Sequence, residues 1–187
     1  MNKSYSELDV LFDVVEKLNE LHIDYMLTGS LAMNYYAEPR MTRDLDFIIE
    51  INEKDIDKFV NNFKEDYYIS KDAITEALHY NSSFNIIHSQ AVIKIDFLIR
   101  KKEEYRKIEF DRKQTIKILD NEINVVSKED LIISKLFWAK ETQSEQQKND
   151  IINLLNTGYD KEYLLKWLEK LDLIIFIKEF IDARYFD

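Results

Sequence analysis

The stretch Thr28-Gly-Ser-Leu-Ala32, with Pro39-Arg-Met-Thr-Arg-Asp-Leu-Asp46 a few residues later, decides the fold of this chain. An apolar run over 23–27 precedes it and predicts a buried strand. Residues 31–37 predict a helix that ends before Pro39, because a proline disfavours helical backbone at the residue before it. The order is therefore strand, tight turn, helix.

The turn itself, Gly29-Ser30, has the chemistry of an anion site. At a strand-to-helix turn, free backbone N–H groups and the positive end of the helix dipole face the same point. Glycine lets a phosphate approach the backbone closely, and Ser30 adds a hydroxyl donor. The alternative is a Gly-Ser pair that only caps the helix. The residues that follow in the sequence distinguish an anion-binding turn from such a cap.

Three carboxylates follow. Asp44 and Asp46 lie two residues apart in the strand predicted over 44–50, so both side chains project from one face. Asp96 is the lone acid in the apolar strand predicted over 91–99, where an unpaired charge is costly. If the two strands are neighbours, the three carboxylates converge opposite the Gly-Ser turn. Such hard oxygen ligands suit Mg²⁺ or Mn²⁺. A solvated strand face is the alternative.

Four residues flank these acids and are candidates to contact phosphates. The alternative is that they are surface residues with no role in binding. They are Arg40, Thr42, Arg43 and Lys94.

A lysine in the C-terminal part is also unusual. Lys135 lies on a helix predicted over 128–140, which Ser127 and Asp130 begin as a variant capping box. Its neighbours three and four positions away are all apolar, and a lysine in a buried stripe is costly unless it snorkels or pairs. Asp150, on the next predicted helix, is its candidate partner; snorkelling along Trp138 is the alternative.

The remaining patterns organise the chain into a small mixed sheet and a helical end. Helices are predicted over 7–21, 53–66, 71–80, 128–140, 145–156, 161–170 and 173–184, and further strands over 83–88, 91–100 and 122–126. Residues 103–117 are ambiguous. We therefore expect an α+β protein with a core over 1–126, its helices on one side of the sheet, and a helical subdomain over 127–187 packed on it.

Composition narrows the function classes. Two glycines and one proline in 187 residues exclude collagen-like and linker-rich chains. The absence of cysteine excludes disulfide scaffolds and thiolate chemistry. A net charge of -10 opposes broad binding to nucleic acid. Without a signal segment or a membrane span, a cytoplasmic protein is expected. The apolar stretch 173–186 predicts a packing helix or part of a homodimer interface.

With these residues in view, the chain resembles the nucleotidyltransferase superfamily. Its signature is Gly-Ser or Gly-Gly, a spacer, Asp-x-Asp and a distal third Asp; here Gly29-Ser30 is followed by thirteen residues, Asp44-Leu45-Asp46 and later Asp96. The fuller string resembles in particular the abortive-infection type of nucleotidyltransferase toxin. Residues 125–136 and 147–155 resemble that group's lysine motif and following acidic helix. The resemblance covers about residues 25–156.

The resemblance implies a minimal polymerase-beta-like fold that moves a nucleoside monophosphate from a nucleoside triphosphate (NTP), such as ATP or GTP, to an acceptor hydroxyl with Mg²⁺ or Mn²⁺. The implied metal ligands are Asp44, Asp46 and Asp96, which are also catalytic together with Lys135 and Asp150. The implied nucleotide-binding residues are Gly29, Ser30, Arg40, Thr42, Arg43, Lys94 and Lys135.

The acceptor and partners stay open at the level of sequence. Transfer RNA or another macromolecule in a toxin–antitoxin setting, with a cognate antitoxin as partner, is favoured by the resemblance. A small acceptor such as an antibiotic is favoured by the net charge. A non-catalytic nucleotide-binding or regulatory module of the same fold is the alternative to an enzyme.

Overall fold

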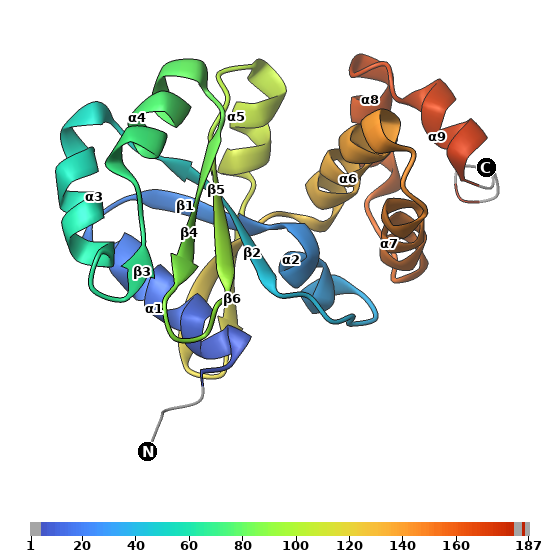
Figure 1. The fold of residues 1–187 in the computed structure, drawn as a ribbon. Helices are drawn as coiled ribbons and strands as arrows, with labels where there is room; N and C mark the ends of the chain where they lie inside the picture. Colours follow the sequence, from blue (N-terminus) through green and yellow to red (C-terminus); the bar gives the residue numbers. More distant parts are fainter. Residues whose placement is uncertain (1–4, 182–184, 186–187) are drawn as a thin grey trace. The chain divides into compact units, whose positions relative to one another are not determined.

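A computed structural model describes residues 5–181 and 185 and contains a mixed sheet of seven strands (Figure 1). The strands are β1 (Asp24–Thr28), β2 (Asp44–Glu50), β3 (Tyr67–Tyr68), β4 (Ser83–His88), β5 (Lys94–Ile99), β6 (Gln114–Ile118) and β7 (Asn121–Val125). Their order across the sheet is β3-β4-β5-β2-β1-β7-β6.

Helices flank the sheet and form the C-terminal part. They are α1 (Glu7–Glu20), α2 (Gly29–Tyr36), the short 3-10 helix η1 (Glu53–Asp55), α3 (Ile56–Phe63), α4 (Lys71–Tyr80), α5 (Glu104–Asp111), α6 (Lys128–Thr142), α7 (Glu145–Asn156), α8 (Lys161–Lys170) and α9 (Ile174–Phe180). Together with the mixed sheet, this arrangement confirms the predicted α+β class. No described helix combines the length and the apolar character needed to cross a membrane.

The centre of the sheet is β2, which runs antiparallel to β1 and parallel to β5. On one face the side chains of β2 and β5 alternate into a buried apolar layer, which includes Phe47 and Phe97. Phe59 of α3 packs against Phe97 with ring centroids 5.5 Å apart, and against Phe84 of β4 at 5.7 Å. Burial of these large rings anchors α3 on this face. The other face of β2 and β5 carries the remaining members of the alternation, which are polar at Asp44, Asp46, Lys94 and Asp96 and apolar at Ile48 and Leu98.

Several regions differ from the sequence expectation, among them the two-residue strand β3, which was not predicted. The ambiguous residues 103–117 form α5 and then β6, and β6 pairs with β7 as an antiparallel hairpin. The helix predicted over 53–66 begins as η1 and continues as α3, which ends at Phe63. The last helix begins at Ile174 and ends at Phe180, and the backbone of Ile181 is extended. The rest of the predicted helix, 182–184, lies outside the described residues.

The scarcity of glycine has a visible consequence in the turns. Besides Gly29 and Gly158, several described residues that carry a side chain adopt a positive φ, a conformation that costs an L-residue about 1–2 kcal/mol. They are His22, Asn81, Val92, Leu119, Gln143 and Asp172. A β-branched residue is the least suited to this backbone, so Val92, at φ 52° in the β4–β5 hairpin, is the most strained of the set.

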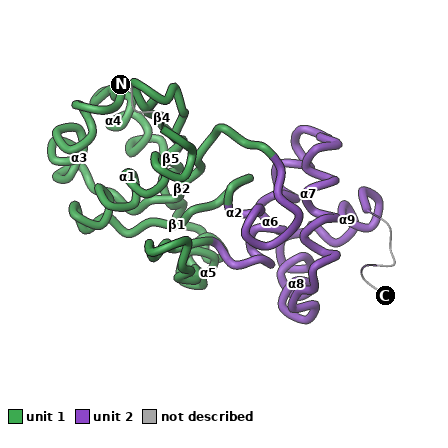
Figure 2. Tube along the Cα trace, turned by 90° about the horizontal axis from the view of Figure 1, so that it is seen from below, with its two compact units in different colours: residues 1–31, 41–125 green, residues 32–40, 126–187 purple. Residues whose placement is uncertain are grey.

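The chain divides into two compact units (Figure 2). Unit 1 comprises Met1–Leu31 and Met41–Val125, and unit 2 comprises Ala32–Arg40 and Val126–Asp187. Unit 2 is thus built from two stretches far apart in the sequence. A division at residue 126 stays a prediction; the contacts group 32–40 with the C-terminal helices.

Candidate functional site

The predicted acids lie together on one face of unit 1. In the parallel pairing of β2 with β5, Asp44 is opposite Lys94 and Asp46 is opposite Asp96. Residues in register on neighbouring strands project to the same face, so all four side chains share the face that the apolar layer leaves open. Asp44 is exposed, and Asp46 and Asp96 are half-buried. The pairing that the sequence argument required is therefore present.

The Gly-Ser turn lies against the second of these acids. Thr28, the last residue of β1, pairs with Asp46, and α2 begins at the next residue, Gly29. A Cβ at Gly29 would lie 2.0 Å from Asp46 Oδ2 and 2.7 Å from Asp46 Cγ, and φ is +67°. Gly29 is thus required both by its backbone conformation and by the nearby Asp46 carboxyl group. The sequence indicated only the close approach of a phosphate as a reason for glycine at this position.

A cation already lies among the carboxylates. Lys94 Nζ is 2.7 Å from Asp96 Oδ2. The hydrogen bond to Asp96 raises the pKa of Lys94 above its ordinary value; burial opposes this rise, and the charges of Asp96, Asp44 and Asp46 add to it. The lysine therefore responds to all three acids.

The fit of a divalent ion can be judged from these groups. Within residues 5–181 and 185, no three His, Asp or Glu side chains are arranged so that they hold a metal ion as they stand. Asp96 is instead paired with Lys94. The donor chemistry fits Mg²⁺ or Mn²⁺ nonetheless, because the three groups are carboxylates on one face, reachable from solvent, and that face already attracts a cation. The metal assignment stays a prediction.

Two further predicted residues lie in the segment that leads into β2. Thr42 Oγ1 donates to the carbonyl of Asp44 at 3.5 Å, a long contact, and Arg43 is exposed. Ser30 follows Gly29 and is half-buried. These residues belong to unit 1 with the acids. Their contact with phosphates stays a prediction.

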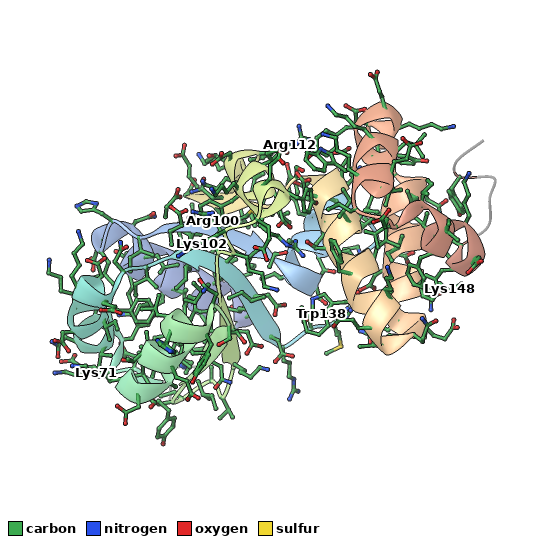
Figure 3. All side chains as sticks on the ribbon, turned by 90° about the horizontal axis from the view of Figure 1, so that it is seen from above. Lys71, Arg100, Lys102, Arg112, Trp138 and Lys148 are labelled. Atoms are coloured by element: carbon green, nitrogen blue, oxygen red, sulfur yellow. The ribbon has the colours of Figure 1, made fainter. Side chains whose placement is uncertain are left out.

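The other predicted residues, Arg40, Lys135 and Asp150, meet in unit 2. Lys135 Nζ is 2.8 Å from Asp150 Oδ2, and Arg40 holds the same carboxylate with Nε–Oδ1 and Nη2–Oδ2 distances of 2.9 Å. Lys135 also donates to Gln147 Oε1 at 3.3 Å. The predicted pairing of Lys135 with Asp150 is therefore present, and the lysine pairs rather than snorkelling along Trp138, which is exposed on α6 (Figure 3).

Burial strengthens the electrostatic interactions of Asp150 with Lys135 and Arg40. Lys135 is 4% and Asp150 3% exposed. Burial on its own would raise the pKa of Asp150, but the hydrogen bonds from Arg40 and Lys135 outweigh it and hold that pKa below its usual range. The bond from Arg40 to Asp150 in turn raises the pKa of the guanidinium. The carboxylate is charged and fully engaged by two cations.

Sequence reasoning missed that Arg40 is a partner of Asp150, because the two residues are separated by 110 positions. It also missed Asn34, whose side-chain amide donates to the Arg40 carbonyl at 2.8 Å and accepts from the Arg40 N–H at 3.0 Å. Asn153 of α7 fixes the same segment by donating to the carbonyl of Glu38 at 3.0 Å. The signal in the sequence was indirect: a short polar segment around a proline, which needs side chains to satisfy its backbone.

No protein-family model matches the chain, and no curated protein matches it. Solved structures do match. An antigenic nucleotidyltransferase-like protein from Paracoccidioides brasiliensis superposes with a TM-score of 0.57 at 16% identity, over 95% of this chain and 93% of that one.

Two further matches are enzymes that act on antibiotics. The lincosamide antibiotic adenylyltransferase LnuA, with lincomycin bound, has a TM-score of 0.57 at 13% identity, over 83% of this chain and all (100%) of that one. ANT(2")-Ia, in complex with adenylyl-2"-tobramycin, has a TM-score of 0.59 at 11% identity, over 89% and 98%. The fold is that of a nucleotidyltransferase. At identities this low, the superpositions establish only the fold of this chain. Its chemistry has to be inferred from the residues of the site.

Proposed function

We propose that the chain is a metal-dependent nucleotidyltransferase. The observation that carries this proposal is the shared face of Asp44, Asp46 and Asp96 on two in-register strands, with the Asp46 carboxyl group directly against Gly29. Three acids around one anion-binding turn repel a phosphate unless positive charge is added. When bound to the three carboxylates, Mg²⁺ or Mn²⁺ supplies that charge and neutralises the phosphates in the transition state.

The residues of the chain then have separate tasks. Backbone N–H groups at Gly29 and Ser30 bind the phosphates of an NTP at the start of α2. The oxygen of an acceptor hydroxyl attacks the α-phosphorus, the bond from that phosphorus to the β-phosphate oxygen breaks, and pyrophosphate leaves. Asp96 accepts the proton of the attacking hydroxyl as general base. Positioning and charge neutralisation provide most of the rate.

The acceptor is proposed from charge and from the structural matches. A net charge of -10 opposes binding to RNA, and two of the matched structures are of enzymes that act on antibiotics. Both features favour a small hydroxylated acceptor. An RNA acceptor in a toxin setting, with an antitoxin as partner, is favoured by the sequence resemblance and is the second arm of the test.

The experiment measures label transfer. Purified protein is incubated with Mg²⁺ and each α-³²P-labelled NTP, with either total RNA or a panel of hydroxylated antibiotics as acceptor. We expect one arm to become labelled, and we expect Asp44→Ala and Asp96→Ala to abolish the transfer. Asp57→Asn is the control, since Asp57 is an exposed acid of α3 paired with Lys71, and α3 packs on the apolar face of the sheet and not on the face of the three acids.

The outcomes separate the alternatives. Transfer that persists in both Asp44→Ala and Asp96→Ala contradicts the assignment of the acids. Absence of transfer with a shift in melting temperature on adding Mg²⁺ and an NTP supports a non-catalytic nucleotide-binding module. Absence of both supports a regulatory module that binds no nucleotide. Catalytic roles for Lys135 and Asp150, and nucleotide binding by Lys135, are proposed from the resemblance. A Lys135→Met variant that folds and transfers label normally would remove the roles of Lys135. Co-purification and sedimentation test for an antitoxin and a homodimer.

A further inference from the structure

Lys94 is the residue of the acid face whose role the proposed reaction leaves unexplained. Its ammonium is held 2.7 Å from Asp96 Oδ2, and its backbone is opposite Asp44 in the β2–β5 register. It lies two residues before Asp96 on the same strand, so both side chains emerge on the same face. A cation is therefore built into the group of carboxylates by the fold itself.

The lysine is placed so that it can leave. Its side chain is 43% exposed, against 24% for that of Asp96, so the ammonium lies towards solvent and the acid lies deeper. A lysine stem has four rotatable carbons, and the ammonium is a compact point charge without the fixed geometry of a guanidinium. Moving it away from Asp96 disturbs none of the apolar layer, which lies on the other face of the strands.

Charge makes the lysine and a divalent ion competitors. One ammonium offsets one of the three negative charges, and a divalent ion that uses Asp96 has to bind where the ammonium already is. Two cations within a few ångströms repel each other when the surroundings are partly desolvated. An ammonium displaced from Asp96 needs a new anion, and lysine binds phosphate well as a point charge.

We propose that Lys94 is an internal counter-ion for the acid face: it holds Asp96 in the metal-free protein, releases it when a divalent ion binds, and then contacts the triphosphate. The inference rests on the proposed function, since it takes Asp44, Asp46 and Asp96 as the metal ligands. Its consequence is coupling. Metal alone binds weakly because it has to displace the lysine, whereas metal and nucleotide bind together because the nucleotide accepts the displaced ammonium.

The test measures metal affinity without catalysis. Mn²⁺ binding to the full chain is followed by the electron paramagnetic resonance signal of free Mn²⁺, first alone and then with the non-transferable α,β-methylene analogues of ATP and GTP. Lys94→Met should bind Mn²⁺ alone at least about fivefold more tightly than wild type, and should lose most of the tightening that the analogue causes in wild type. Lys94→Arg keeps the charge and should stay close to wild type.

Lys71→Met is the matched control. Lys71, at the start of α4 (Figure 3), forms an exposed pair with Asp57, with Nζ–Oδ1 at 2.6 Å, so this variant removes the same charge from a comparable pair. Its Mn²⁺ affinity should equal that of wild type. A general effect of net charge would instead tighten Mn²⁺ binding equally in both variants and would contradict the inference.

Other outcomes are equally decisive. Unchanged or weaker Mn²⁺ binding by Lys94→Met overturns the competition, and label transfer by wild type in the same preparation would show that the proposed function survives without it. Absence of Mn²⁺ binding in every variant overturns the inference together with the metal assignment. If Lys94→Met fails to fold, Lys94→Gln, which keeps a polar side chain beside Asp96, replaces it in the same titration.

Discussion

Replacing Gly29 by alanine tests the contact on which the candidate site is built. The new Cβ would lie 2.0 Å from Asp46 Oδ2 and 2.9 Å from Asp46 Cβ, so the carboxyl group has to rotate away or the start of α2 has to shift. Gly158 provides the control, because it also has a positive φ, +79°, but nothing lies within 4 Å of its Cβ position. The pair separates backbone strain from overlap with Asp46.

The expected magnitudes follow from these two terms. At Gly158 only the backbone term acts, and alanine should lower the free energy of unfolding by about 1 kcal/mol. At Gly29 the overlap adds the cost of overpacking, about 1–3 kcal/mol, for a total of about 2–4 kcal/mol. In a chain of 187 residues each kcal/mol corresponds to about 2–4 °C in melting temperature.

The assay is urea denaturation of both variants, repeated in an Asp46→Ala background. There the cost of Gly29→Ala should fall, because the oxygen at 2.0 Å is gone, yet it should stay above that of Gly158→Ala, because the Asp46 Cβ remains at 2.9 Å. Equal costs at the two glycines, or a cost at Gly29 that is unchanged when the Asp46 carboxyl is removed, would refute the reasoning.

Three further predictions concern stability. Asp150→Ala leaves Lys135 and Arg40 without their shared buried partner and should cost about 3–5 kcal/mol in urea denaturation, whereas a cost under 1 kcal/mol would show that water replaces the carboxylate. In the folded protein the pKa of Asp150 is below its ordinary value of 3.8, so the carboxylate stabilises the fold fully above that value and loses this effect as the pH falls through the folded pKa. The difference in unfolding free energy between wild type and Asp150→Asn should therefore be larger at about pH 6 than at about pH 3. A constant difference would contradict the assignment. Val92→Gly relieves a positive φ at a side chain that is 75% exposed and should raise the free energy of unfolding by about 0.5–1 kcal/mol, while Ala91→Gly in the same turn should lower it; a loss of stability in both would show that Val92 is not strained.

Sequence reasoning reached the acid face because it depends on strand periodicity. The two-residue spacing of Asp44 and Asp46 fixes one face, and the isolation of Asp96 in an apolar strand marks a charge that needs a partner. The sequence could not predict that the two strands are neighbours in the sheet; the structure shows that β2 pairs with β5. The pairing of Lys135 with Asp150 was predictable from the lysine, whose neighbours three and four positions away are all apolar. The sequence alone also allowed Asp150 to be an exposed helix charge, and the structure shows that it is buried.

Other features depend on contacts that no local pattern carries. The exposed edge strand β6 buries only Ile116 well and its turn has no glycine, so neither alternation nor turn composition identified the hairpin. The demand that Asp46 places on Gly29 depends on how closely β2 approaches the end of β1. The bond between Arg40 and Asp150 depends on tertiary packing over 110 positions.

The split composition of unit 2 has a consequence for synthesis on the ribosome. Arg40 emerges 110 residues before its partner Asp150, about 5–20 s earlier at ordinary elongation rates. During that interval the Glu38 carbonyl lacks Asn153, and the Tyr36 hydroxyl lacks the Val126 carbonyl to which it donates at 2.7 Å. In the nascent chain, residues 32–40 therefore lack their partners from unit 2 while most of unit 1 has already been synthesised. A fragment that ends at residue 126 would keep the Val126 carbonyl and would never contain Asp150 or Asn153. Residues 32–40, which belong to unit 2, would then stay without these two partners.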